Sequence, residues 1–114
     1  LIGSELEMFE SLVEIVVDGG HGVRAYNSCA KAARARISSE PDNAAALTLI
    51  MFAAQGVVEA YDDQPLPIDA ADALLDNFRG MVATLDAAYA DGTGEAKLAA
   101  LNAVSVQLVE AAKN

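Results

Sequence analysis

The chain has 114 residues, a length that fits one ordinary domain with a core large enough to fold without disulfides or metals. Its net charge is −10, from 17 acidic and 7 basic residues, so its surface repels nucleic acid and anionic lipid, and neither is expected as a partner. The single cysteine excludes an internal disulfide, and a reducing cytoplasm is the simplest compartment. Abundant alanine and aspartate with little lysine fit a bacterial source of high GC content or a halophile.

The first two predicted helices are amphipathic and are separated by glycines. Ser4 and Glu7 form a capping-box pattern, and apolar residues then follow at helical spacing until Gly19 and Gly20. A second helix is predicted over residues 23–38, where an apolar stripe recurs at alternating steps of three and four. Each of these helices therefore has one face for a shared core.

The third predicted helix, over about residues 43–61, is apolar on every side. Between Asp42 and Glu59 no residue is charged. A helix of this kind either crosses a membrane or lies at the centre of a bundle. The apolar run is shorter than the roughly 18 residues that a membrane span needs, and Thr48 and Gln55 interrupt it. We therefore expect a buried central helix and no membrane partner.

Two further helices follow the proline-containing loop of residues 62–67. Asp69 is the expected N-cap of the fourth helix, and the segment Asp-Gly-Thr-Gly at 91–94 separates it from the fifth. No segment has the two-residue period of a β-strand, and no linker divides the chain. The sequence therefore predicts one all-α domain, residues 1–114, built as an antiparallel bundle of about five helices around the helix at 43–61.

Metal-binding and catalytic motifs are weak in this sequence. Aspartates gather around the long loop, but their spacing matches no calcium loop, so we expect helix caps and a solvated acidic face; they are Asp62, Asp63, Asp69, Asp72 and Asp76. Cys29 borders an apolar stripe and is expected to be a small buried residue rather than a nucleophile. We therefore expect no metal, no cofactor and no catalytic residues.

His21, the only histidine, suggests one specific mechanism. The segment His21-Gly22-Val23-Arg24-Ala25 resembles the signature of histidine phosphotransfer domains, which are small, acidic helical bundles. In that family a basic residue stands three positions after the phospho-accepting histidine and glycine usually follows, whereas this chain has alanine there. The resemblance implies phosphotransfer through His21. The alternative is an exposed turn histidine with no special role, because two glycines precede it, whereas the family's histidine lies within a helix.

The second helix holds four of the seven basic residues. Arg24, Lys31 and Arg34 share one face beside the apolar stripe, while Arg36 points elsewhere. As a functional site, this face would dock an acidic partner or an anion. The more common alternative is ion pairing with acidic residues of the first or fourth helix.

Three polar side chains within apolar segments, Thr48, Gln55 and Ser105, suggest a small-ligand pocket in the bundle interior. The alternative is structural. Serine and threonine commonly bond back to the preceding helical turn, and a buried glutamine commonly makes one bond between helices.

The apolar content points to a partner. Apolar residues make up 54% of the chain and charged residues only 21%, so some apolar surface is expected to lack polar cover. We therefore predict a non-enzymatic helical-bundle interaction module, like small bacterial regulatory, adaptor, chaperone or immunity proteins, with an unidentified protein partner and a homodimeric state. The alternatives are phosphotransfer through His21 and a bundle that binds a small ligand.

Overall fold

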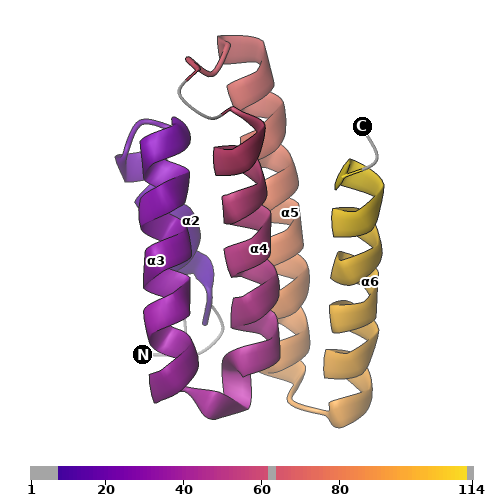
Figure 1. The fold of residues 1–114 in the computed structure, drawn as a ribbon. Coiled ribbons are helices and arrows are strands. Elements are labelled where there is room, and N and C mark those ends of the chain that lie inside the picture. The colour runs from indigo at the N-terminus through magenta and orange to yellow at the C-terminus, as the bar shows by residue number, and fades with distance from the viewer. Residues whose placement is uncertain (1–7, 62–63, 113–114) are drawn as a thin grey trace.

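The computed structural model describes residues 8–61 and 64–112, and almost all of them are helical. The elements are α2 (Glu10–Asp18), α3 (Val23–Ser39), the short 3₁₀ helix η1 (Pro41–Asn43), α4 (Ala44–Ala60), α5 (Ile68–Asp91) and α6 (Gly94–Ala112). From α3 to α6, successive helices run in opposite directions (Figure 1). The described ranges contain no strand, and the predicted all-α bundle is confirmed.

Helix boundaries agree with the sequence except at two starts. The capping box at Ser4 and Glu7 lies outside the described residues, and α2 begins at Glu10. The predicted N-cap at Asp69 is wrong, because Pro67 occupies that position in an extended conformation and Asp69 lies in the first turn of α5. The backbone carbonyl of Pro67 accepts a hydrogen bond from the N–H of Ala71 at 2.8 Å, so the helix starts before the aspartate.

The core lies among α2, α3, α4 and α5. The side of α4 that faces α3 and α5 carries fully buried small and branched residues, among them Ala46, Leu47 and Ile50. Tyr26 of α3 packs edge-to-face against Phe78 of α5, with ring centroids 5.7 Å apart. Such aromatic pairs add about 0.5–1.5 kcal/mol to the burial of the rings.

The central helix, α4, contacts α3, α5 and α6 but keeps one open face. Phe52 is 54% exposed, and Gly56 and Glu59 on the same side are also exposed. Burial of the 43–61 helix is thus partial, where the sequence suggested burial on every side. The reason is α6, in which Ala100 and Val104 are buried but none of the residues 105–111 is.

By length and composition alone, the segment Pro41–Ala60 is apolar enough to cross a membrane, with a mean hydropathy of 1.4 over its best window. The sequence argument that the run is too short is therefore wrong. Central helices of bundles meet the same criterion. Here the segment packs against three neighbouring helices.

Candidate protein-docking groove

His21 lies in the turn between α2 and α3, not on a helix. Its backbone is left-handed, with φ of 63°, and its N–H donates to the carbonyl of Val16 at 3.0 Å. Gly19 allows a close approach of the two helices, because a Cβ there would lie 2.8 Å from the Cβ of Ala25. Phosphotransfer would require an exposed histidine on a helix, whereas His21 is half-buried in this turn.

The predicted basic face of α3 is present and exposed. Arg24, Lys31 and Arg34 all point to solvent, and none forms an ion pair with an acidic residue of the described ranges. The expected pairing with acids of neighbouring helices is therefore not seen in the part of the chain that the structure describes. The apolar stripe beside this face is buried in the core, so the face offers charge without an apolar surface.

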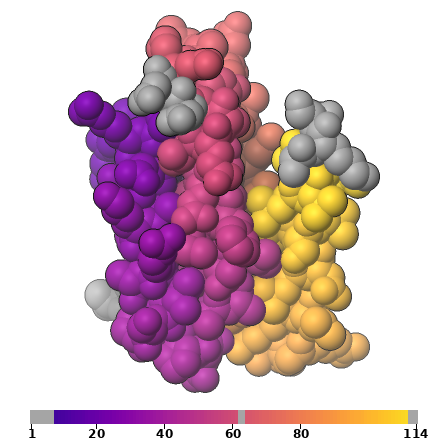
Figure 2. Space-filling view, viewed as in Figure 1, coloured from indigo at the N-terminus to yellow at the C-terminus, as the bar shows by residue number. Residues whose placement is uncertain are grey.

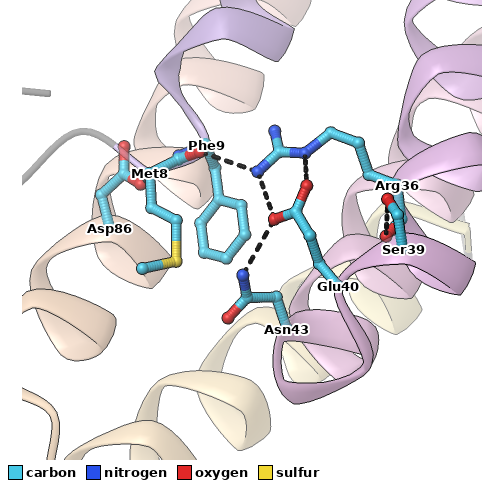
Figure 3. A network of polar contacts seen from close by, with 7 residues as sticks. All are labelled: Met8, Phe9, Arg36, Ser39, Glu40, Asn43 and Asp86. Atoms are coloured by element: carbon cyan, nitrogen blue, oxygen red, sulfur yellow. Dashed lines mark hydrogen bonds and ion pairs between the residues drawn. The ribbon is translucent and has the colours of Figure 1, made fainter. Parts of the chain in front are cut away.

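Arg36, which the sequence set apart, joins the end of α3 to the segment before α2 (Figure 3). Its Nε and Nη2 donate to the two carboxylate oxygens of Glu40, at 2.6 and 2.9 Å. Nη2 also donates to the backbone carbonyl of Met8 at 3.0 Å, and the guanidinium lies 5.7 Å from the ring centroid of Phe9. Hydrogen bonding from Arg36 lowers the pKa of Glu40 to about 2. The contacts of Arg36 with Glu40, Met8 and Phe9 hold the segment before α2 against the end of α3, so we assign Arg36 a structural role.

The thiol of Cys29 is fully buried, as the sequence suggested. Burial raises its pKa to about 12, so the thiol stays protonated at neutral pH and is a poor nucleophile. Tyr26, one turn earlier, is also buried, and burial raises its pKa to about 12. These two residues fill the core.

An apolar groove of about 550 Å³ lies between α4 and α6, with α5 at its base (Figure 2). We call it the α4–α6 groove. Most of its lining is apolar: Phe52, Ala53 and Val57 from α4, Leu74, Phe78 and Met81 from α5, and Leu108 and Ala111 from α6. After Val104, no residue of α6 whose burial is described is fully buried, and this leaves the groove open. Its volume falls within the range of binding sites in proteins.

A second groove, also of about 550 Å³, runs along the other side of α6 against α5. This α5–α6 groove shares Asn77, Met81 and Ala111 with the first. It is more polar, and its lining includes Asp76 and Thr84. The C-terminal part of α6 is therefore flanked by open space on both sides.

Two helix-interior glycines line these grooves, Gly56 in α4 and Gly80 in α5. A Cβ built on either would meet no other atom within 4 Å, so packing within the chain does not require them. Glycine inside a helix costs about 0.5–1 kcal/mol relative to alanine. At these two positions the helices therefore carry no side chain, although alanine would make each helix more stable.

The charged side chains of the two grooves are all acidic. Glu59 lines the α4–α6 groove, and Asp76 and Glu110 line the α5–α6 groove. No lysine, arginine or histidine of the described ranges lines either one. Within those ranges no group of three or more histidine, cysteine, aspartate or glutamate side chains is placed to hold a metal ion.

Sequence reasoning missed these grooves. The possible ligand pocket at Thr48, Gln55 and Ser105 does not coincide with them, because none of these residues lines either groove. Ser105 instead donates to the carbonyl of Leu101 at 2.7 Å, which is the structural alternative. The available signal was Gly56, a glycine inside a strong helical pattern, with Phe52 one turn before it.

In comparison with known proteins, the chain matches no protein family, no curated protein and no solved structure, so its function is argued from this geometry.

Proposed function

We propose that this protein is a non-enzymatic interaction module that binds a segment of another protein in the α4–α6 groove. The observation that carries the proposal is the groove itself, an apolar hollow of about 550 Å³ beside an exposed Phe52. Soluble domains rarely leave such surface uncovered unless a partner occupies it.

The large side chains that are less than 2% exposed in the described ranges all lie outside the groove lining. The fully buried core residues come mainly from α2, α3, the inner face of α4, and α5. Aromatic side chains and methionine are enriched where proteins meet, and Phe52, Phe78 and Met81 supply these types at the groove. This composition supports a docking role for the groove.

The two candidate reactive groups lie away from the groove. Cys29 is buried, and its pKa is raised to about 12. His21 belongs to the α2–α3 turn and lines neither groove. Their positions support a binding role for this groove rather than catalysis.

The remaining functional expectations stay predictions. A regulatory, adaptor, chaperone or immunity role in the bacterial cytoplasm fits a small acidic module with one buried cysteine. The homodimer also stays a prediction, and exposed Leu98 and Val109 on α6 supply apolar surface for it. Sedimentation equilibrium over a wide concentration range tests it, with a doubled mass expected at high concentration.

The docking function is tested by amide chemical shifts of labelled protein titrated with an amidated 18-residue peptide of leucine and glutamine, with its leucines at helical spacing. We expect saturable shifts at Ala53, Gly56, Met81 and Leu108, which surround the groove. The basic face of α3 serves as the internal control and should not shift. Absence of saturable shifts at the groove would overturn the proposal.

A further inference from the structure

We propose that the segment bound in the α4–α6 groove is a basic amphipathic helix of a partner protein. This inference rests on the proposed function and adds the partner's chemical class. The groove takes the apolar face of that helix, and the acidic side chains beside it pair with lysines or arginines on the helix flanks.

The shape of the groove favours a helix as the occupant. It lies between two helices with a third at its base, and an amphipathic helix laid in an apolar groove is a recurring mode of recognition. Along its α4 wall, Ala53, Gly56 and Ala60 are spaced by three and four residues, so they share one face. These small residues let a partner backbone come close to α4.

Gly56 gives an independent reason for that close approach. It weakens α4, yet no atom of the described chain lies where its Cβ would be. The surface of α4 is therefore open at Gly56 to the backbone of a partner. Phe52, one turn earlier on the same wall, is 54% exposed and would cover the bound helix from the side.

The charges around the groove select a basic partner. Glu59 on α4 lines the α4–α6 groove and is exposed. Asp76 on α5 is also exposed; it lines the neighbouring α5–α6 groove and precedes Asn77, which lines both. No basic residue of the described ranges lines either groove. Acidic edges attract a basic segment during encounter and repel acidic ones. The net charge of −10 acts in the same direction over the whole surface.

A second copy of this chain is a poor occupant of the groove. Its own net charge is −10, so it would bring net negative charge to a groove that already carries Glu59. Its one basic face, on α3, has its apolar stripe buried in the core and brings no apolar side chains to the groove. Its exposed Val106 and Val109 lie beside Glu110, which would be brought toward Glu59.

The test compares three labelled 18-residue peptides with one leucine pattern and with lysine, glutamine or glutamate at all other positions. Fluorescence anisotropy at low ionic strength should show the lysine peptide binding about tenfold more tightly than the glutamine peptide, and the glutamate peptide more weakly than both. About 0.5 M salt should remove most of the lysine advantage, because exposed charges are then screened.

Two matched double variants test which carboxylates of the protein attract the lysine peptide. The double variant Glu59→Gln/Asp76→Asn should weaken binding of the lysine peptide about threefold to tenfold and leave the glutamine peptide unchanged. The control Glu14→Gln/Asp18→Asn removes the same charge from exposed positions at α2 and should change the affinity less than about twofold.

The outcomes separate this inference from the proposed function. If the glutamine peptide binds at the groove as tightly as the lysine peptide, the inference fails and the docking function stands. If no peptide perturbs the groove, both fail. Equal weakening by the two double variants would show attraction to the overall charge and overturn the inference. A homodimer that Glu59→Gln/Asp76→Asn strengthens and Gly56→Leu abolishes would make a second copy the occupant and overturn it also.

Discussion

The carboxylate of Asp86 on α5 accepts a hydrogen bond from the backbone N–H of Phe9, with nitrogen and oxygen 2.6 Å apart and the residues separated by 77 positions in the sequence. Both residues are buried, and the Phe9 ring packs edge-to-face on Tyr89 one turn along α5. The pair therefore ties the start of the described chain to a helix near its other end.

Asp86→Ala should lower the free energy of unfolding by about 2–3 kcal/mol, because it leaves the buried N–H of Phe9 without its acceptor. Asp86→Asn keeps an acceptor oxygen and should cost less. Urea unfolding followed by circular dichroism measures both. A loss below about 0.5 kcal/mol for the alanine variant would show that this contact does not hold the N-terminal segment.

Glu40→Gln should make the free energy of unfolding less dependent on pH between 7 and 3. Arg36 lowers the pKa of Glu40 from 4.5 to about 2, so the charged pair stabilises the fold above pH 4.5 and loses that effect as the pH falls toward 2. We expect the variant to lose about 1 kcal/mol at pH 7 and to approach the native protein as acid is added. Urea unfolding from pH 7 to pH 3 measures this. A constant difference across that range would contradict the charged pair.

Tyr26→Phe should stabilise the protein or leave it unchanged. The Tyr26 hydroxyl is buried, and no group of the described chain hydrogen-bonds to it, so removing it relieves a desolvation cost of about 1 kcal/mol. Tyr89→Phe is the matched control, because the Tyr89 hydroxyl hydrogen-bonds with the backbone of Ala46. Thermal unfolding should rise or hold for the first variant and fall for the second; the reverse order would show that Tyr26 has a partner.

Gly56→Ala and Gly80→Ala should each raise the free energy of unfolding by about 0.5–1 kcal/mol, since alanine favours the helix and its Cβ meets no atom at either site. Gly19→Ala should do the opposite, because its Cβ would lie 2.8 Å from that of Ala25. Chemical unfolding of the three variants measures the contrast. Destabilisation by the first two would mean that packing within the chain needs those glycines.

The helices could be predicted from the sequence because each has a local pattern. The stripe of α3 and the charge-free run of α4 define both helices to within a few residues. The start of α5 could not be predicted, because Pro67 and Asp69 are both acceptable near a helix start and only the backbone path decides between them.

The docking groove could not be predicted in the same way. Its wall residues look like ordinary core residues, and whether the space beside them is filled depends on how α6 packs against α4 and α5. Likewise, the contact between Asp86 and Phe9 depends on the way α2 packs on α5. Periodicity specifies the face of a helix but not how completely its neighbours cover that face.

The most direct measurement of the docking function is the affinity of the leucine–glutamine peptide for Gly56→Leu, with Gly56→Ala as control. Leucine favours a helix nearly as much as alanine, and its side chain projects into the groove, where no atom lies within 4 Å of the added Cβ. We predict an intact fold, shown by a melting temperature at least equal to that of the native protein, and affinity weakened about tenfold or more. A well-folded leucine variant that binds the peptide as tightly as the native protein would contradict docking in the α4–α6 groove.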